Sequence, residues 1–350
     1  MNKLEQYCIE ANATIRTAFK KMGQLSDKFI LVKENEKIIG IVTDGDFRRA
    51  IWGSVPFDNP IGEITNLSYI FFSTGHTNRE INETFREKNI GQIPVIKNGK
   101  LVKVYSRDDI DVINKKPFKK SSNIPVIIMA GGKGTRLDPF TRILPKPLIP
   151  IGNEPIIEII MNEFSGYGVS EFHLTLNDKS KMIKAYFHDH SFKYKIHFIE
   201  EKKPLGTAGA LRLIPLNNVC SIIVTNCDII IKDDYNRIIE YHEEMENDIT
   251  LIGSLQHYKV PYGVCKVGEK GNLKSIMEKP EYDYLSNTGF YILEKSILKL
   301  IPKDRYFDMT DLINKALGDN FKVGVYPVSD RSWIDIGQWE EYRKAVNALT

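Results

Sequence analysis

The chain has 350 residues, more than one hydrophobic core usually serves, so two domains or one domain with a large appendage are expected. The net charge is +3, from 48 basic and 45 acidic residues, and this balance argues against nucleic acid as a partner. No apolar run reaches the roughly 18 residues of a membrane-spanning helix, so no contact with a membrane is predicted.

The N-terminal residues and the cysteines indicate a cytoplasmic protein. The sequence MNKLEQYCIE lacks the basic and apolar stretches of a secretory signal. Four cysteines are scattered along the chain without a CxxC pair: Cys8, Cys220, Cys227 and Cys265. This spacing predicts reduced thiols rather than disulfides or a zinc site.

The first third of the chain contains an internal repeat. Residues Phe29–Asp46 return as Gln92–Asp109, each 63 positions later. Each copy has two β-branched runs around a polar turn, which predicts a hairpin with a helix before it and another after it. Apolar residues at helical spacing place the preceding helices near Thr14–Met22 and Glu80–Lys88. Neither copy has much of a core, so we expect the two to bury each other's sheets.

The repeat resembles a tandem pair of CBS domains. The strand-to-helix signature of that family is carried by Gly40–Asp46, whereas the second copy departs from it at Lys103 and Arg107. The resemblance implies that an adenine nucleotide binds to a hydroxyl and a carboxylate, here Thr43 with Asp46, or Ser106 with Asp109. The alternative is that Asp46 caps the following helix and that the pair serves only packing or an oligomer contact.

A domain boundary lies in the segment Asp111–Asn123, which loses apolar periodicity and gains charge, a proline and two serines. We assign residues 1–58 to the first repeat and 59–114 to the second. Residues 115–123 form the linker, and 124–350 form the second domain.

A glycine-rich loop follows the first apolar run of the second domain. Ile124–Ala130 is typical of a buried parallel strand. Gly131, Gly132 and Gly134 then allow positive φ angles and bring backbone amides close to phosphate oxygens. Arg136 adds a forked, permanently charged donor. Together these features predict a site for a phosphate group, although neither the P-loop nor the GxGxxG pattern is present.

Residues Gly131–Pro155, GGKGTRLDPFTRILPKPLIPIGNEP, resemble the signature of the sugar-nucleotide pyrophosphorylase family. The resemblance implies transfer of a nucleotidyl group from a nucleoside triphosphate to a sugar 1-phosphate, with release of pyrophosphate. It also implies an α/β fold with a Rossmann-like, mostly parallel mixed sheet and helices on both faces. Arg136 and Lys146 are then the catalytic residues at the nucleotide phosphates. Prolines on both sides of Lys146 restrict the backbone there.

The same resemblance implies a nucleotide site made of the glycine loop and a PLGTAGAL segment at Pro204–Leu211. The expected nucleotide-binding residues are Ala130, Gly131, Gly132, Lys133, Gly134, Thr135, Glu201, Pro204, Gly206 and Thr207. A carboxylate at Glu200 or Glu201 suits the N1–H and N2–H₂ donors of guanine, so GTP is the preferred donor, with UTP, dTTP and CTP as alternatives. Thr207 also suits the N-cap of a helix.

The metal and sugar residues follow in family order. Asp228 after the predicted strand Ser221–Thr225 and Asp335 in a WxDxG element are the implied Mg²⁺ ligands. The implied sugar-phosphate residues are Tyr262, Gly263, Glu278, Lys279, Asn287 and Thr288. A carboxylate and amides can recognise sugar hydroxyls, and Lys279 offsets the charge of the phosphate.

The signature is most similar to that of guanylyltransferases acting on mannose, heptose or amino-sugar 1-phosphates, and we expect a homo-oligomer. The alternative is a non-catalytic nucleotide sensor. Such a protein would have lost Arg136, Lys146, Asp228 or Asp335, and all four are present.

Overall fold

The computed structural model describes residues 4–25, 28–88, 90–106, 124–190, 192–216 and 219–337, together with 339, 341–343 and 346. The chain forms two compact units, Met1–Lys115 and Lys116–Thr350, and each is described by itself. Within the described residues, every helix is too short or too polar to cross a membrane.

The N-terminal unit contains the two sequence repeats. The first repeat consists of η1 (Glu5–Tyr7), β1 (Cys8–Glu10), α1 (Ile15–Gly23), β2 (Phe29–Glu34), β3 (Lys37–Thr43) and α2 (Asp44–Trp52). The second consists of η2 (Ile61–Ile64), α3 (Asn78–Lys88), β4 (Gln92–Lys97) and β5 (Lys100–Ser106). The hairpins and the helices before them recur at the predicted offset. Asp109 and the helix expected after β5 lie outside the described residues.

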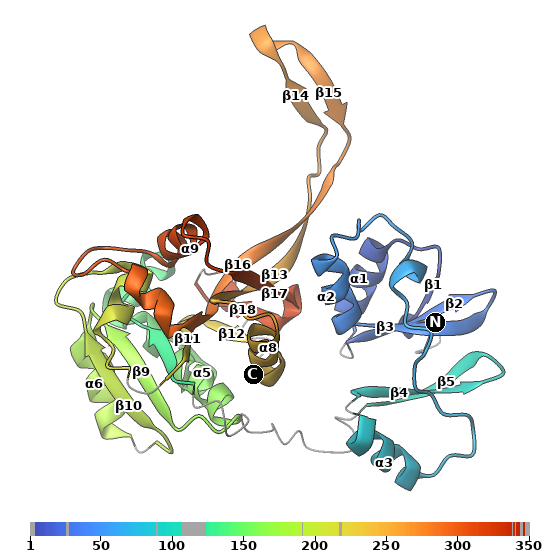
Figure 1. Cartoon of the computed structure of the whole chain (residues 1–350), viewed down its shortest axis with the longest axis horizontal. Coiled ribbons are helices and arrows are strands. Elements are labelled where there is room, and N and C mark those ends of the chain that lie inside the picture. The colour runs from blue at the N-terminus through green and yellow to red at the C-terminus, as the bar shows by residue number, and fades with distance from the viewer. Residues whose placement is uncertain are drawn as a thin grey trace. The chain divides into compact units, whose positions relative to one another are not determined.

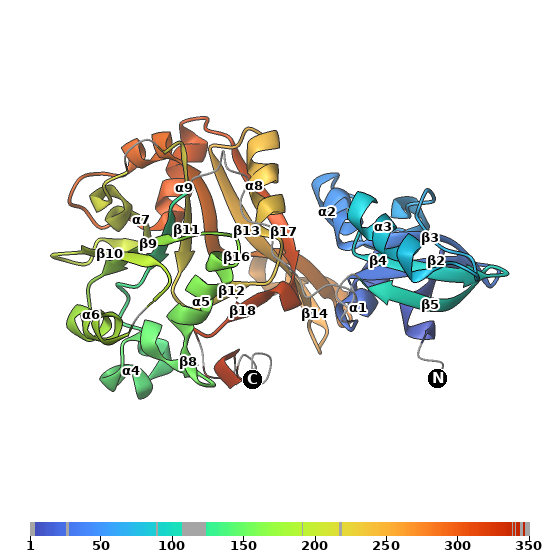
Figure 2. The ribbon, with the colours of Figure 1, turned by 90° about the horizontal axis from the view of Figure 1, so that it is seen from below.

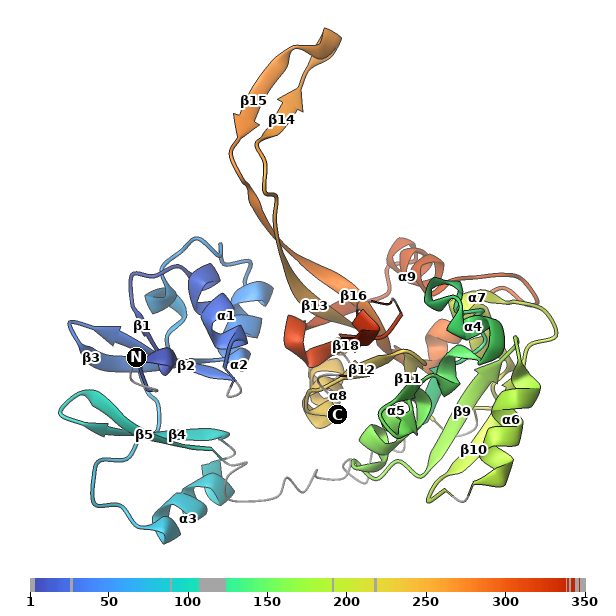
Figure 3. The same ribbon diagram turned by 180° about the vertical axis from the view of Figure 1, so that it is seen from behind.

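The two repeats pack on each other, as predicted, but the expectation that neither has much of a core is wrong for the first repeat, which has its own cluster of buried residues. Phe29, Leu31 and Ile41 are buried against Leu101 and Val104 of β5. A backbone hydrogen bond of 2.9 Å from Ile38 N to Gly99 O also joins the two hairpins. Figure 3 shows the β4–β5 hairpin beside the sheet formed by β1, β2 and β3. Because a lone hairpin is marginally stable in water, the two-stranded β4–β5 sheet gains support from the first repeat.

The start of α2 shows what holds Asp46. The backbone N–H and the hydroxyl of Thr43 donate to Asp46 Oδ2 over 2.7 and 2.6 Å. This is a capping box, and Arg49 forms an ion pair with the other carboxylate oxygen. The capping role considered for Asp46 is therefore present. Ser106 is buried at the end of β5. Binding of an adenine nucleotide to these residues stays a prediction.

The C-terminal unit is built on a seven-stranded sheet of order β10-β9-β6-β11-β16-β13-β17. Its strands are β6 (Val126–Met129), β9 (Glu171–Leu176), β10 (Lys195–Glu200), β11 (Ser221–Asn226), β13 (Ile249–Lys259), β16 (Glu281–Glu294) and β17 (Val323–Ser329). Strand β16 runs antiparallel to β11 and β13, and the other neighbours are parallel. The predicted mixed, mostly parallel sheet is confirmed.

Helices cover both faces of this sheet. Residues of α5 (Ile156–Ser165), α6 (Ser180–Asp189) and α8 (Tyr235–Glu244) share one core with one face. Residues of α7 (Gly206–Gly209), η6 (Ala210–Leu213), η8 (Lys295–Leu300) and α9 (Met309–Gly318) share a second core with the other face. Figure 2 shows α6 and α9 on opposite sides of the strands. Neighbouring residues of β6 divide between the cores, Ile128 in the first and Ile127 in the second, as expected for a doubly covered strand.

Shorter elements complete the unit. The segment after β6 contains η4 (Thr135–Leu137), α4 (Phe140–Ile143), η5 (Lys146–Leu148), β7 (Pro150–Ile151) and β8 (Glu154–Pro155). Strand β12 (Ile229–Ile231) pairs with β18 (Trp333–Asp335), which follows η9 (Asp330–Ser332). Strands β13 and β16 continue into a two-stranded ribbon of β14 (Val264–Val267) and β15 (Leu273–Met277), joined through η7 (Glu269–Gly271). This ribbon projects from the body of the unit (Figure 1).

We predict that Asp46→Ala lowers the free energy of unfolding of the N-terminal unit by about 1–2 kcal/mol, because it removes a helix cap. Hydrogen–deuterium exchange of the full chain should show faster exchange at the first amides of α2. Asp58→Ala is the control, since the Asp58 side chain is 81% exposed and forms a surface ion pair of 3.2 Å with Arg16. Equal effects of the two substitutions would contradict this role of the cap.

Candidate active site

Four parallel strands end at the same edge of the sheet. In the observed register, Glu200 of β10 is opposite Leu176 of β9, and Asn226 of β11 is opposite Met129 of β6. The segments that follow these strands begin at Glu201, Asn177, Ala130 and Cys227. Ligands of open α/β sheets bind at this edge, so the topology brings the predicted nucleotide and metal residues into one region.

The glycine loop begins directly after β6, and its glycines differ in backbone conformation and in their neighbours. Ala130 is buried, and its N–H donates to Thr175 O over 3.0 Å. The expected positive φ occurs only at Gly134, with φ 65°, and Gly131 and Gly132 do not have it. Gly131 instead lies against Glu201: a Cβ there would be 2.6 Å from Glu201 Oε1, so a side chain at this position would require the end of Glu201 to shift. Lys133, Thr135 and Arg136 remain exposed around the turn.

Three charged groups meet beside this loop. Lys146 and Asp228 are both buried and form an ion pair through Nζ and Oδ2. Asp335 is brought to the same point because Ile229, next to Asp228, pairs with it across β12 and β18. A Cβ on Gly337 would lie 2.9 Å from Asp335 Oδ1, 3.0 Å from Asp228 Oδ2 and 3.4 Å from Lys146 Nζ. The glycine of the WxDxG element therefore leaves room where these groups converge.

The electrostatics of this cluster favour a cation. Burial raises the pKa of the Asp335 carboxyl, and the negative charge of Asp228 raises it further. The Gly337 N–H, which donates to Asp335 Oδ1, and the charges of Lys146 and Arg136 act in the opposite direction. Two adjacent carboxylates in a partly buried place repel each other, and the single positive charge of Lys146 compensates only part of their charge.

The donor set fits Mg²⁺. Carboxylate oxygens are the hard ligands that this ion takes, and it commonly uses only one or two of them while phosphate and water supply the rest. Among the described residues, no group of three or more His, Cys, Asp or Glu side chains is arranged to hold a metal alone. Asp228 and Asp335 would therefore hold the ion only together with a bound phosphate group.

The carboxylate of Glu201 faces the glycine loop, whereas that of Glu200 does not. Glu200 forms an exposed ion pair of 2.8 Å with Lys184 of α6. Glu201 is half-buried, and its Oε2 accepts a hydrogen bond of 2.9 Å from Leu205 N. Burial raises the pKa of its carboxyl. Oε1 lies against Gly131 and has no hydrogen-bond partner among the described residues.

The PLGTAGAL segment is fixed by the start of α9. Gly206 has φ 80°, and a Cβ there would lie 2.7 Å from Phe307 O. Thr207 N donates to Asp308 Oδ1 over 3.0 Å, and the Thr207 hydroxyl accepts from Met309 N over 2.8 Å. The expectation that Thr207 caps its own helix is wrong, because its hydroxyl serves the neighbouring helix and α7 has no side-chain cap. Pro204 is exposed.

The sugar-phosphate residues divide between the sheet and the ribbon. Thr288 is buried and donates to Ile252 O over 2.8 Å, and Asn287 donates to Tyr291 Oη over the same distance. Tyr262, Gly263, Glu278 and Lys279 lie where the ribbon begins. A Cβ on Gly263 would lie 3.1 Å from Glu278 Oε2, and Lys279 Nζ is 4.0 Å from Glu278 Oε1.

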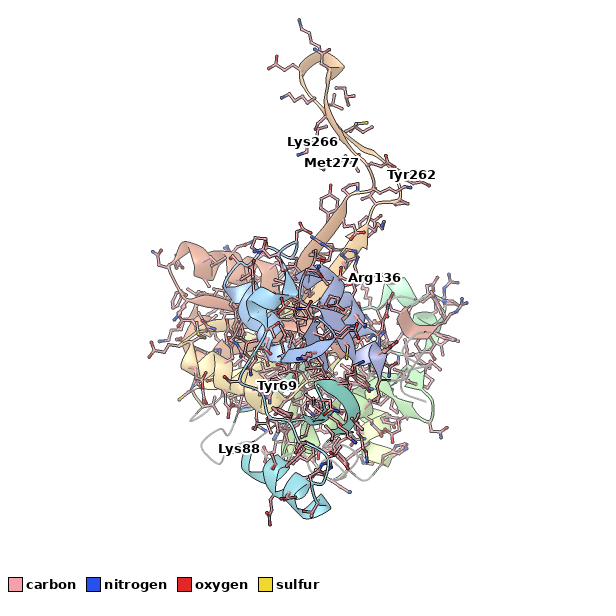
Figure 4. The ribbon with its side chains drawn as sticks, turned by 90° about the vertical axis from the view of Figure 1, so that its right-hand side faces the viewer. Tyr69, Lys88, Arg136, Tyr262, Lys266 and Met277 are labelled. Carbon is pink, nitrogen blue, oxygen red and sulfur yellow. The ribbon has the colours of Figure 1, made fainter. Side chains whose placement is uncertain are left out.

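The structure does not bring the ribbon residues to the glycine loop. Among the described residues, no hydrogen bond or ion pair joins Tyr262, Glu278 or Lys279 to Arg136, Lys146 or Asp228. Figure 4 shows Tyr262 on the projecting ribbon and Arg136 on the body of the unit. Among the predicted residues, Glu201 thus lies at the glycine loop and Lys146, Asp228 and Asp335 lie together, whereas four of the six sugar residues stand apart from them.

Comparison with known families agrees with this arrangement. The family model described as nucleotidyl transferase matches residues 125–350, and the CBS domain model matches 3–53 and 61–111. The chain belongs to the nucleotidyl transferase family. Its N-terminal unit is a CBS pair, as the repeat predicts.

The names of several relatives of this nucleotidyl transferase specify different nucleotide donors. The UTP–glucose-1-phosphate uridylyltransferase of Synechocystis sp. is 30% identical over 64% of this chain and 62% of that protein. A mannose-1-phosphate guanyltransferase of Aspergillus fumigatus is 32% identical over 62% of this chain and 61% of that protein. The chain thus spans less than two thirds of the length of these curated relatives. The crystal structure of HddC from Yersinia pseudotuberculosis complexed with GMP-PN has a TM-score of 0.51, with 27% identity over 65% of this chain and 100% of that one.

Two residues of the site were not predicted from the sequence. Asn177 follows β9, and its amide donates to Glu201 O over 3.1 Å, which ties the ends of two parallel strands. Gly337 is needed for space at the carboxylates. A polar residue directly after a buried strand could have indicated Asn177. Gly337 belongs to the WxDxG element, but the sequence does not show that it also lies next to Asp228 and Lys146, which are more than one hundred positions away.

Gly134→Ala should lower the free energy of unfolding of this nucleotidyl transferase by about 1–2 kcal/mol, because a side chain in the left-handed region is strained. Its Cβ would also lie 2.9 Å from Thr141 Cγ2 and 3.1 Å from Lys146 Cβ. The matched control is Gly132→Ala, where no atom lies within 4 Å of the new Cβ. Thermal unfolding without ligand measures both, and an equal loss in the two variants would contradict the geometry of the loop.

Proposed function

We propose that the chain transfers GMP from GTP to a sugar 1-phosphate, giving a GDP-sugar and pyrophosphate, with Mg²⁺ as cofactor. The observation that carries this proposal is the meeting of Lys146, Asp228 and Asp335 beside the glycine loop. Cations and loop amides on one side suit a triphosphate, and the two carboxylates suit the metal ion that accompanies it.

The chemistry requires charge stabilisation rather than a base. An oxygen of the sugar 1-phosphate attacks the α-phosphorus of GTP, and the bond to the departing pyrophosphate breaks. The attacking oxygen is already anionic near neutral pH, so no proton has to be removed from it. Lys146 and Arg136 stabilise the negative charge that develops on the α-phosphate and the leaving pyrophosphate. Mg²⁺ bound at the carboxylates supplies additional positive charge when present.

Lys146 is positioned for this task by its own contacts. The prolines at 145 and 147 restrict the backbone of η5, and the ion pair with Asp228 holds the ammonium group at the end of β11. Arg136 differs, since it is exposed on η4 and can follow the phosphates. A fixed Lys146 and an adaptable Arg136 together suit the triphosphate, because negative charge shifts from the α-phosphate to the leaving pyrophosphate during the reaction.

The preference for GTP rests on Glu201. A carboxylate offers only acceptors, which match the N1–H and N2–H₂ donors on one edge of guanine. Its Oε1 lies at the glycine loop, whereas Glu200 pairs with Lys184 at the surface, and this difference supports Glu201. The names of the guanyltransferase relative and of the HddC complex with GMP-PN support the same donor, and the uridylyltransferase relative favours UTP.

Lys146→Met should lower kcat/KM for GTP by roughly 10²–10³-fold, because a positioned charge at the phosphates is lost. The measurement is pyrophosphate release with Mg²⁺, GTP and a panel of sugar 1-phosphates, with circular dichroism to check the fold. Lys299→Met, which changes an exposed lysine of η8, is the control and should leave the rate unchanged. A folded Lys146→Met variant with near-normal turnover would refute the catalytic role.

Glu201→Gln should reduce the ratio of kcat/KM for GTP to that for UTP by roughly 10–100-fold, since a hydrogen bond to a charged group is worth about 1.5–3 kcal/mol. An amide matches uracil, which presents acceptors beside its N3–H donor. Glu200→Gln is the control and should leave the ratio unchanged. If Glu201→Gln leaves the GTP to UTP ratio at the wild-type value, the assignment of the base is wrong.

A further inference from the structure

The residues that carry Lys146, 138–150, which we call the lysine segment, lie outside the seven-stranded sheet. The segment contains α4 with four residues and η5 with three, and it leads into β7, which forms a separate two-stranded sheet with β8. Short helices gain most of their stability from packing against other elements rather than from their own hydrogen bonds. The position of the lysine segment therefore depends on contacts with other parts of the chain.

The C-terminal part of the chain contacts both ends of the lysine segment. Trp339 Nε1 donates to Asp138 O over 2.9 Å. Tyr342 Oη donates to Pro150 O over 2.8 Å. Trp339 and Tyr342 are three positions apart in helical backbone, so their side chains lie on the same side of that helix. Two side chains of one helical turn thus join the two ends of the segment.

Aromatic contacts add to these hydrogen bonds. The Phe140 ring of α4 packs against Trp339, with 4.8 Å between ring centroids, and against Tyr342 at 6.3 Å. The rings of Trp339 and Tyr342 lie 6.0 Å apart and nearly perpendicular, at 83°. Centroid separations of roughly 4.5–7 Å are favourable for aromatic pairs. Phe140 is 42% exposed, so this cluster holds α4 at the surface, outside both hydrophobic cores.

The same part of the chain follows directly on Asp335. Pairing of β18 with β12 fixes Asp335, and Ile336 N donates to Asp228 O over 2.9 Å. Four positions further along comes Trp339, and Tyr342 then packs against the core that α5, α6 and α8 share. Figure 2 shows β18, β8 and α4 on the same side of the strands. The C-terminal part is therefore anchored on both sides of Trp339 and can hold the lysine segment in place.

We propose that Trp339 and Tyr342 are positioning residues: they hold both ends of the lysine segment and thereby keep the ammonium group of Lys146 at the phosphates. They act through Lys146 and not on the substrate itself, and the kinetic part of this inference rests on the proposed function. A displacement of about 1 Å of a positioned group can lower a rate by roughly 10²-fold. Loss of the two contacts should therefore lower kcat.

Binding of GTP should change much less than kcat. Gly131, Gly132 and Arg136 come before the lysine segment in the chain, and Glu201 follows another strand. These groups keep their own supports when the ends of the segment loosen. The expected signature is a lower kcat with a nearly constant KM for GTP. A role in stability alone would lower the amount of folded protein and leave kcat per folded molecule unchanged.

Hydrogen–deuterium exchange of the full chain tests the contact itself. The variant Trp339→Phe/Tyr342→Phe keeps an aromatic ring at each position and removes both hydrogen bonds. Amides of the lysine segment should then exchange roughly fivefold faster or more, since one net hydrogen bond changes an equilibrium by about this factor. Tyr241→Phe is the control, because it removes a hydroxyl that donates to Val325 O over 3.2 Å elsewhere in the same unit. Unchanged exchange in the lysine segment of the double variant, or an equal increase in the control, would overturn the proposal.

A double-mutant cycle with Lys146 separates positioning from general stability. In the wild-type background, Trp339→Phe/Tyr342→Phe should lower kcat for pyrophosphate release from GTP roughly tenfold, with KM for GTP changed by less than about twofold. In the Lys146→Met background, the same two changes should lower kcat by less than about twofold, because the group that they position is gone. Tyr241→Phe should leave kcat unchanged. An equal loss of kcat in the two backgrounds would overturn the positioning role.

The two experiments also separate this inference from the proposed function. Hydrogen exchange requires no activity, so it decides whether Trp339 and Tyr342 hold the lysine segment even in a chain that transfers no nucleotide. Absence of transfer by the unmodified chain contradicts the proposed function. Normal exchange and normal kcat in the double variant of an active chain contradict the positioning role.

Discussion

The repulsion between Asp228 and Asp335 is the constraint on which the C-terminal unit depends. Both carboxylates lie at the end of the sheet, and burial makes their charges costly. Lys146 compensates part of this negative charge by forming an ion pair with Asp228 beside the glycine loop. One lysine neutralises one of the two carboxylates, so both acids can stay in the folded protein. The remaining negative charge attracts a further cation. This balance links the fold to the proposed chemistry.

Several local features surround this group of charges. Gly337 leaves space where a side chain would meet both carboxylates, and Gly134 adopts a positive φ where a Cβ would touch Lys146. Parallel strands β10, β9, β6 and β11 end together, so their following residues meet without long loops. The C-terminal segment adds support, since Trp339 Nε1 donates to Asp138 O over 2.9 Å. Distant segments of the chain thus fix one compact group of charges.

Much of this organisation could be predicted from the sequence because the signals are local. The constant offset of the repeat predicted the positions of both hairpins, and the apolar run before Gly131 predicted the central strand β6. The order of motifs then indicated that Asp228 and Asp335 belong to one site. Local patterns could not show that Gly131 lies against Glu201 without a positive φ, or that Thr207 contacts α9. Both depend on neighbours brought close only by the folded sheet. The projection of the ribbon carrying Glu278 and Lys279 likewise has no signature in the sequence.

The central claim is that this cluster promotes attack on the α-phosphate of GTP. Its most direct test is to incubate the full chain with Mg²⁺, sugar 1-phosphates and GTP labelled at the α-phosphate, and then to locate the label. The account predicts label in a GDP-sugar and none in the pyrophosphate released. Absence of any labelled GDP-sugar across a broad panel, or label released as free phosphate, would contradict it.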